Sequence, residues 1–438
     1  MFQFCSRLIL GLACVAGITC GAVFADEKDV VIDISSPKRS KYPIATVNAQ
    51  KDSALSREIK RVIDFDLDIS SWFRILEERG FLEKPSDTID VIDVEAWKSN
   101  GAFGVIKYKV VEVGPRVELE FRLFEIEKDS APLLSLKYSG AKEDIRRLTH
   151  KFCDKVVEHF TGESGFFASS IVFSTRSGRG PKKIVSIDFD GANLKTLTKS
   201  KWINILPAFS PDGNKVLFTS FQNQKTSVVV KHLRKGTTKR VSAQKGMNVG
   251  GSWSPDGSQI ALTLSKDGNS EIYVVNAQGG GVVRRLTNHK AIDTSPAWSP
   301  SGKEIAFVSD REGGPQVFVM SANGSNIRRV SMNGAYNTTP AWSPRLDERR
   351  IAYTTRDEKT FDIVTLDLDT KKMVRITQRE GVNEEPTFSP NGRVLAFSSF
   401  REGKQGVYLV PANGKGTAKR VWKGKAFSLD WGPSPSSK

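Results

Sequence analysis

The chain has 438 residues, enough for two or three domains, and its 39% hydrophobic and 26% charged residues are typical of a soluble protein with a packed core. Four cysteines and four histidines over this length argue against a disulfide-rich scaffold and against a histidine–cysteine metal array. The 65 Lys and Arg residues exceed the 49 Asp and Glu residues, and the net charge of +16 makes an anionic partner, including nucleic acid, the first hypothesis.

The first 25 residues have the pattern of a cleavable secretory signal. Arg7 precedes an apolar run at 8–18, and the small residues Val23 and Ala25 stand just before the acidic residues 26–27. The run is too short to span a bilayer comfortably, so we expect an exported protein whose signal is removed after Ala25. A retained membrane anchor is the alternative. Cleavage would leave Cys153 as the single cysteine, and therefore no internal disulfide.

The charge divides the remaining chain into two parts. Residues 26–162 carry 23 Lys and Arg against 26 Asp and Glu, a net charge of −3. Residues 163–438 carry 41 against 23, a net charge of +18. Because the repeats described below also begin after this point, we predict one domain over 26–162 and a second over 163–438.

The first of these domains is predicted to be a small α/β domain. Apolar residues at helical spacing favour a helix over 55–67, and alternating apolar and polar residues favour strands over 103–113 and 116–126, joined by Gly114-Pro115. The other expected elements are strands at 30–34, 44–47 and 73–76, a short helix at 94–99 and a final helix at 144–160.

The second domain contains six copies of a short motif, an aromatic residue followed in most copies by Ser-Pro and an Asp-Gly-like pair. The aromatic residues are Phe209, Trp253, Trp298, Trp342, Phe388 and Trp431, at intervals of 44, 45, 44, 46 and 43 residues. This period is typical of the four-stranded blades of a β-propeller. In each copy the aromatic residue is expected to end one strand, and the Pro, Asp or Asn, and Gly to form the turn into the next.

The two ends of the array are out of phase with the other copies. Residues 171–198 supply three strands without a preceding aromatic motif, and residues 427–431 supply that missing strand alone. We therefore predict an all-β propeller of six four-stranded blades, in which the C-terminal strand closes the ring and removes the exposed sheet edges.

Ten basic residues recur on the predicted outermost strands. They are Lys195, Lys239, Arg240, Arg284, Arg285, Arg328, Arg329, Arg375, Lys419 and Arg420. They either form an electropositive rim or protect the outer edges from pairing with another sheet. Export and the lack of exposed aromatic residues between these basic positions argue against nucleic acid as the partner.

A second repeated pattern precedes the aromatic residue in five blades. An apolar residue is followed by Asn or Asp and then by two variable positions, in the segments 203–206, 247–250, 292–295, 336–339 and 382–385. The Asn or Asp is expected to bond local backbone. The variable positions are expected at the mouth of the central channel, where partner recognition could differ between blades.

The sequence offers no candidate catalytic residue, cofactor site or metal site. It has no Gly-x-Ser-x-Gly nucleophile motif. The four histidines, His150, His159, His232 and His289, lack the spacing of metal ligands and are predicted to be isolated surface or packing residues. The acidic residues of the segment 64–68 alternate with apolar residues, which favours a helix end over a calcium loop.

The signal, the small α/β domain and the six-fold repeat of Pro-Ala-Trp-Ser-Pro-Asp-Gly-like elements together resemble the TolB family. Members of this family are periplasmic components of the Tol–Pal system. The Asp-Val-Val-Ile-Asp sequence at 29–33, directly behind the signal, is part of the resemblance. The resemblance covers nearly all of the chain after residue 25, and it implies a monomeric, non-catalytic adaptor without a cofactor that supports outer-membrane integrity and cell division.

The resemblance also implies two partner sites. The propeller face would bind the peptidoglycan-associated lipoprotein Pal, and the N-terminal segment that follows the signal would bind TolA or its equivalent. The Pal-facing positions would be Met247, Asn248, Gly250, Thr294, Ser295, Asn337, Glu384 and Glu385, and the TolA-binding segment would contain Val30, Val31, Ile32 and Asp33. The chain departs from the family at two positions, since some members have His at Met247 and Glu at Ser295. The protein would then associate peripherally with the complex of outer membrane and peptidoglycan.

Two other classes of function remain open from the sequence. The propeller could be a carbohydrate-active enzyme or a glycan-binding sensor, because related repeats occur in metal-dependent lyases. That hypothesis predicts a metal or glycan in the channel, and the scarcity of histidine argues against it. An accessory domain of a peptidase is the third hypothesis.

Overall fold

The fold is taken from a computed structural model that describes residues 41–50, 52–82, 88–128, 130–357 and 360–433. The predicted strand at 30–34 and the signal segment lie outside these residues. Among the described residues, no helix is long and apolar enough to cross a membrane.

Within the described residues, the N-terminal domain contains the predicted elements in the predicted order, together with one strand that was not predicted, β5. Its strands are β1 (Tyr42–Asn48), β2 (Phe73–Ile75), β3 (Gly104–Val113), β4 (Arg116–Glu125) and β5 (Leu134–Ala141), and its helices are α1 (Ala54–Ile69), α2 (Val94–Ser99) and α3 (Ile145–Thr161), with short 3-10 turns at Glu78–Gly80 and Lys142–Asp144. A Ser53 capping box starts α1, because the Ser53 and Ser56 side chains each accept a bond from the other residue's backbone N–H. Gly162 ends α3 in the left-handed conformation, at φ 69°.

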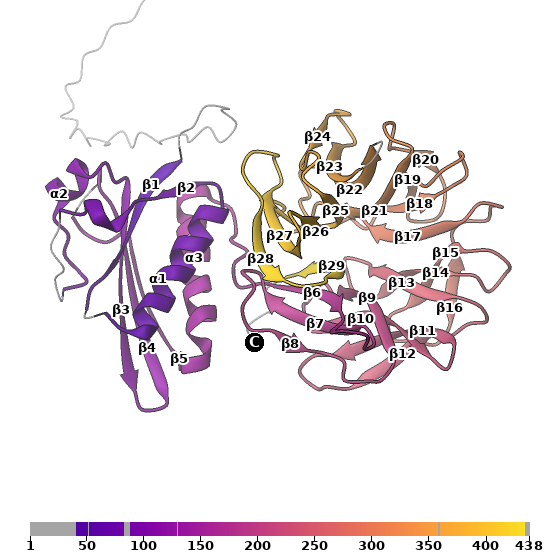
Figure 1. The fold of residues 1–438 in the computed structure, drawn as a ribbon, viewed down its shortest axis with the longest axis horizontal. Coiled ribbons are helices and arrows are strands. Elements are labelled where there is room, and N and C mark those ends of the chain that lie inside the picture. Colours follow the sequence, from indigo (N-terminus) through magenta and orange to yellow (C-terminus); the bar gives the residue numbers. More distant parts are fainter. Residues whose placement is uncertain (1–40, 51, 83–87, 129, 358–359, 434–438) are drawn as a thin grey trace, which may run out of the picture. The chain divides into compact units, whose positions relative to one another are not determined.

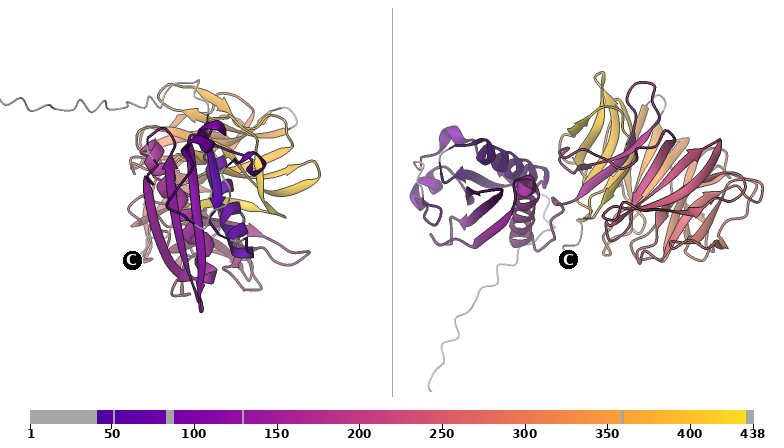
Figure 2. Two further views of the ribbon diagram at one scale, coloured as in Figure 1. Left: turned by 90° about the vertical axis from the view of Figure 1, so that its left-hand side faces the viewer. Right: turned by 90° about the horizontal axis from the view of Figure 1, so that it is seen from below.

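The five strands form one mixed sheet in the order β2-β1-β3-β4-β5. Helices α1 and α3 lie side by side on one face, where Ile106 and Phe121 join their common core (Figures 1 and 2). The next residues along the strands point the other way, since Val105 and Phe124 pack with Trp97 of α2. Both faces of the sheet are therefore covered, at least in part, by helices.

The second domain is a six-bladed propeller with four antiparallel strands in each blade (Figure 1). Blade 1 contains β29 (Phe427–Gly432), β6 (Ser170–Thr175), β7 (Lys183–Asp188) and β8 (Lys195–Thr196), and blade 2 contains β9 (Ile203–Phe209), β10 (Lys215–Gln222), β11 (Lys225–His232) and β12 (Thr238–Ser242). Blade 3 contains β13 (Asn248–Trp253), β14 (Gln259–Leu264), β15 (Glu271–Asn276) and β16 (Val282–Arg285), and blade 4 contains β17 (Asp293–Trp298), β18 (Glu304–Ser309), β19 (Gln316–Ser321) and β20 (Arg328–Arg329). Blade 5 contains β21 (Tyr336–Trp342), β22 (Arg350–Asp357), β23 (Thr360–Asp367) and β24 (Met373–Arg375), and blade 6 contains β25 (Val382–Phe388), β26 (Val394–Arg401), β27 (Lys404–Pro411) and β28 (Lys419–Lys423).

The predicted ring closure is confirmed. Strand β29, near the C-terminus, pairs antiparallel with β6, which opens the propeller sequence, and Trp431 lies opposite Ile171. The Trp431 indole donates a 2.7 Å hydrogen bond to Ser169 Oγ, and Asp430 accepts one from the backbone of Phe209 in blade 2. The last strand therefore links the first two blades.

The Ser-Pro-Asp-Gly turns follow the inner strands as predicted. In the first copy the Asp212 side chain accepts bonds from Ser210 Oγ at 2.5 Å and from the backbone N–H of Asn214 at 3.1 Å, and Gly213 has φ 68°. These bonds to the charged form hold the pKa of Asp212 at about 2. The turn is thus stabilised by an ionised Asp.

One hydrophobic core joins the N-terminal domain to blades 1 and 6. It includes Phe152 of α3, Ile187 of β7 and Leu409 of β27, all buried. Lys419 of β28 also forms an ion pair with Asp68 of α1. The described residues from 41 to 433 accordingly belong to a single compact unit.

Candidate partner-binding face of the propeller

The six inner strands line a central cavity of about 600 Å³. They are β9, β13, β17, β21, β25 and β29, and each ends at the aromatic residue of the repeat or one residue beyond it. All six strands run in the same direction, so their first residues lie together at one mouth of the cavity and the Ser-Pro turns lie at the other.

Each inner strand contains a β-bulge just after its start. In blade 4, for example, Thr294 pairs with Val308 and Ala297 pairs with Ala306, which leaves two residues of β17 opposite one of β18. The first residue of every bulge has a left-handed backbone and lines the cavity: Leu206, Gly250, Ser295, Thr339, Glu385 and Ser428, with φ between 26° and 59°. The bulge therefore gives each blade one side-chain position at the cavity wall.

The Asn or Asp before each bulge is buried beneath the mouth of the channel. Asn248 is fully buried, accepts hydrogen bonds from Ser242 Oγ and Gln244 N at 2.7 Å and donates one to the Gln244 carbonyl at 2.8 Å. Asn337 is also fully buried and donates to the Asn333 carbonyl at 2.8 Å. The prediction that these residues bond local backbone is confirmed for these two Asn residues. It is wrong for Asp293, whose carboxylate pairs with the Arg311 guanidinium at 2.9 Å.

The apolar residue before each Asn or Asp is exposed. The exposed fractions are 45% for Ile203, 46% for Met247, 52% for Ile292, 36% for Tyr336 and 38% for Val382. Since each residue lies at or just before the start of an inner strand, the five form an interrupted apolar rim at one mouth of the cavity. Blade 1 breaks the pattern, because Lys425 occupies the corresponding position. An apolar rim of this kind is a feature of protein-interaction surfaces.

The eight Pal-facing residues expected from the resemblance divide into three groups. Met247, Gly250, Thr294, Ser295 and Glu385 line the cavity or its mouth. Glu384 is half-buried beside them. Asn248 and Asn337 are fully buried, so direct contact with a partner is not open to these two side chains. Their contribution would be to hold the loops in place. The expected TolA-binding residues Val30, Val31, Ile32 and Asp33 lie outside the described residues.

Two carboxyl groups of the channel are held in an apolar environment. Burial raises the pKa of Glu385 to about 7, although a backbone bond from Ser428 favours the charged form. Burial likewise raises the pKa of Asp430 to about 6, against bonds from the backbone N–H groups of Phe209 and Trp431. The channel wall therefore carries groups whose charge changes near neutral pH.

The basic residues of the outer strands are partly neutralised by neighbouring acids. Arg328 pairs with Glu304 at 2.8 Å, and Arg375 pairs with Asp362 at 3.2 Å. Lys239 and Arg240, in contrast, are exposed. Part of the positive charge on the outer strands is therefore neutralised by ion pairs with neighbouring acidic residues.

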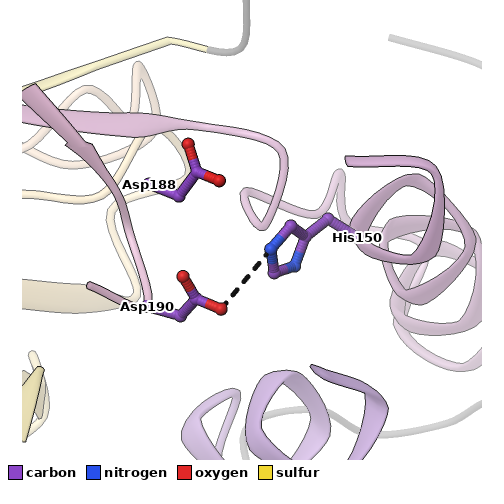
Figure 3. A group of neighbouring side chains, drawn as sticks. All are labelled: His150, Asp188 and Asp190. Carbon is purple, nitrogen blue, oxygen red and sulfur yellow. Dashed lines mark ion pairs between the residues drawn. The ribbon is translucent and has the colours of Figure 1, made fainter. Parts of the chain in front are cut away.

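The prediction of an isolated histidine is wrong for His150. Its ring is 1% exposed, and Nδ1 lies 2.7 Å from Asp66 Oδ2 of α1. The other ring nitrogen faces Asp190 in the β7–β8 turn (Figure 3). Sequence inspection missed the contact because 84 residues separate His150 from Asp66. The segment 64–68 is helical, as predicted, and its middle acid is the buried partner of His150.

Comparison with known proteins agrees with the architecture. The chain is 35% identical over 259 residues to the Tol-Pal system protein TolB of Desulfosudis oleivorans, which covers 57% of this chain and 58% of the relative. It is 37% identical over 281 residues to that of Anaeromyxobacter dehalogenans, with 63% and 64% covered. The matched part of the chain thus spans about three-fifths of the length of these relatives.

A solved structure has the same fold. The crystal structure of TolB from Acinetobacter baumannii superposes with a TM-score of 0.78 and 24% identity, covering 90% of this chain and 97% of that chain. Family models described as the TolB amino-terminal domain and the TolB beta propeller domain match residues 30–131 and 157–435. With both domains matched in this order, the chain belongs to the TolB family.

Proposed function

We propose that this protein is a non-catalytic periplasmic adaptor of the Tol–Pal system that binds Pal through the apolar rim of its propeller. Curated relatives named as Tol-Pal system proteins support this assignment. Residues 1–25 would direct export, residues 26–162 would form the N-terminal domain and residues 163–438 the propeller. The adaptor would support outer-membrane integrity and cell division.

The exposed apolar rim is the observation that carries the proposal. Ile203, Met247, Ile292, Tyr336 and Val382 come from five successive blades, and each is at least 36% exposed. A partner that covers all five would remove a ring of apolar surface from water around the mouth of the cavity. Specific protein interfaces usually have an apolar centre that is surrounded by charged or polar residues.

The N-terminal segment would bind TolA as an added strand. Val30, Val31, Ile32 and Asp33 form a short apolar run, and a free strand of this kind can pair with the edge of a partner's sheet. Deletion of residues 26–36 is therefore expected to abolish TolA binding and to leave Pal binding unchanged.

The proposal can be tested by titrating Pal from the same organism into the purified chain. Met247→Asp and Ile292→Asp are each expected to weaken binding at least tenfold, because a carboxylate replaces apolar surface at the centre of the interface. Leu346→Asp is the matched control, since Leu346 is 78% exposed and follows the inner strand at its opposite end. Equal weakening by all three variants would place the interface elsewhere, and no Pal binding by the unaltered chain would refute the function.

A further inference from the structure

A cluster of one histidine and two acids lies where helix α3 meets the end of β7 and the turn that follows it, away from the channel. It contains the buried His150 of α3 and the half-buried Asp188 and Asp190, at the end of β7 and in the β7–β8 turn, and one ligand atom from each lies within 4.8 Å of the other two (Figure 3). Neither the apolar rim nor the N-terminal segment involves these residues. The cluster therefore needs an explanation of its own.

The His150 ring is oriented as in many metal sites. Nδ1 is bonded to Asp66 Oδ2 at 2.7 Å, and in the neutral ring the nitrogen that donates to a carboxylate carries the hydrogen. The lone pair is then on Nε2, which is buried and has no hydrogen-bond partner among the described residues. Nε2 faces Asp190 Oδ2 at 3.6 Å, beyond hydrogen-bond distance.

The spacing of the donor atoms matches a divalent cation. Zinc bonds of about 2.0–2.2 Å in tetrahedral geometry place neighbouring donor atoms about 3.3–3.6 Å apart. The separation of 3.6 Å between His150 Nε2 and Asp190 Oδ2 is at the upper end of this range. One carboxylate oxygen of Asp188 lies within 4.8 Å of both atoms.

The turn that carries the two carboxylates is held in place. Asn193 Nδ2 donates to Asp188 Oδ2 at 2.6 Å, and the backbone N–H of Ala192 donates to Asp190 Oδ1 at 3.2 Å. Gly191, directly after Asp190, has φ 92°, and a Cβ there would lie 1.9 Å from the Val421 carbonyl oxygen, so the turn requires glycine. The first ligands would therefore be positioned before an ion arrives.

The charge balance favours a cation. Asp66, Asp188 and Asp190 stand against the guanidinium of Arg146, which pairs with Asp190 Oδ2 and with Glu58, and the ammonium group of Lys195, whose charge favours ionised Asp188. An ion bound by Asp190 would share that carboxylate with Arg146 or displace it, and Glu58 would remain as the partner of Arg146. Buried carboxylates in excess of buried cations are stabilised by a bound metal ion.

We propose that His150, Asp188 and Asp190 form a binding site for a divalent transition-metal ion, with Asp66 holding the His150 ring. One imidazole nitrogen and two carboxylate oxygens suit zinc, with water at any remaining position. Because His150 belongs to the N-terminal domain and both Asp residues belong to the propeller, the ion would have ligands from both domains and would link them.

Zinc binding to the chain, purified without a histidine tag and stripped with a chelator, tests the site. Isothermal titration calorimetry is expected to give one zinc ion per chain, and His150→Ala and Asp188→Asn are each expected to lower the affinity at least tenfold. In addition, Co²⁺ is expected to show visible d–d bands of a low-coordination site, which both variants lose. Zinc should also raise the Tm of the unaltered chain but not of the variants.

His159→Ala is the matched control, because His159 lies on the same helix and is exposed. It should bind zinc like the unaltered chain. Asp188→Asn separates loss of the metal site from misfolding, because this variant keeps the Asp66–His150 and Arg146–Asp190 contacts. Unchanged affinity in Asp188→Asn, equal loss in His159→Ala, or the absence of stoichiometric zinc binding would each overturn the proposal.

Discussion

In each inner strand, one residue with a left-handed backbone determines both the bulge and the direction of a side chain. Ser295, Thr339 and Glu385 have φ between 52° and 59°, which is costly for a residue other than glycine. The pairing of the bulge with the second strand compensates, and Glu385 also gains a bond from its backbone N–H to Thr354 Oγ1 at 3.0 Å. The same bulge turns the side chain into the cavity.

The sequence could not have revealed this position. The six residues are Leu, Gly, Ser, Thr, Glu and Ser, so no residue type marks it. The Ser-Pro-Asp-Gly turn was predictable because Pro, Asp and Gly each impose a local backbone preference. A bulge, in contrast, is set by the pairing between strands, and local preferences do not encode it.

Glu385 is expected to make stability depend on pH. Its pKa is about 7 in the folded protein and near 4.5 when unfolded, so the folded state binds more protons between these values. The resulting stabilisation is fully present below pH 4.5 and is lost as the pH rises through 7. Lys182 and the Ser428 N–H oppose the shift, Glu384 adds to it, and Glu385 is half-buried, so about 1–2 kcal/mol is expected.

Urea unfolding of the chain and of Glu385→Gln between pH 5 and 8 measures the contribution of Glu385 to the free energy of unfolding. The Gln variant keeps an acceptor for Ser428 and cannot ionise, so it should gain stability relative to the unaltered chain as the pH rises. Other titrating groups, such as Asp430, are common to both proteins and cancel in the difference. A constant difference across the pH range would contradict the assignment.

Two tryptophans at equivalent positions of neighbouring blades should respond differently to substitution. The Trp342 indole N–H donates to the Ala297 carbonyl at 3.0 Å, whereas that of Trp298 is buried and has no hydrogen-bond partner in the part of the chain that the structure describes. Trp342→Phe loses a hydrogen bond, while Trp298→Phe removes an unsatisfied donor. Because the change in volume is the same, Trp342→Phe is expected to cost about 1 kcal/mol more. Denaturant midpoints of the two variants check this, and equal losses would contradict it.

At the scale of elements, the sequence predicted those with a strong internal pattern and missed one with a weak pattern. Helix α1 and the paired strands β3 and β4 have dense apolar periodicity, and all three were predicted. Strand β5 was not, since its burial merely alternates between half-buried and exposed over its first six residues. It is the edge strand of the sheet, and its pairing with β4 rather than its own composition makes it a strand.

Strand β29 is the element on which ring closure depends. Truncation after Lys425 would remove Leu429 and Trp431 from the core and expose the edge of β6. A loss above about 4 kcal/mol is expected, which corresponds to a drop in Tm of about 5 °C or more for a chain of this size that unfolds as one unit. Thermal unfolding followed by circular dichroism measures the drop.

Deletion of residues 434–438 alone is the matched control for this truncation. It shortens the same end of the chain and keeps every residue of β29, so its Tm should be within about 2 °C of that of the full chain. If both truncations lower the Tm equally, closure by β29 is not the stabilising contact.

At the scale of the whole molecule, the order and type of the two domains were readable from the sequence, but the contacts between them were not. The contacts that join α3 to the β7–β8 turn are made by residues 40 or more positions apart, such as Arg146 with Asp190. No local pattern encodes which helix face meets which blade. The sequence therefore predicted two domains and left open how strongly they are coupled.

The shared core predicts that the two domains unfold together. Phe189, in the β7–β8 turn, is fully buried and packs against Phe65 of α1 at 5.8 Å between ring centroids and against His150 of α3 at 5.3 Å. Calorimetry of the chain should therefore show one transition, with equal calorimetric and van't Hoff enthalpies. Phe189→Ala removes the ring that both domains contact and should cost about 3–5 kcal/mol. Because the lost contacts are those between the two domains, the variant should show two separate unfolding transitions.

Phe307→Ala separates loss of coupling from loss of stability. Phe307 is also fully buried, but it packs within the core of blades 3 and 4, against Phe318. Its removal should lower the Tm by a similar amount, since the same ring is lost from a packed interior, and should leave a single transition. Two transitions in the unaltered chain, or in Phe307→Ala as well as Phe189→Ala, would show that the domains are independent and that the buried contacts of α1 and α3 with the propeller do not couple them.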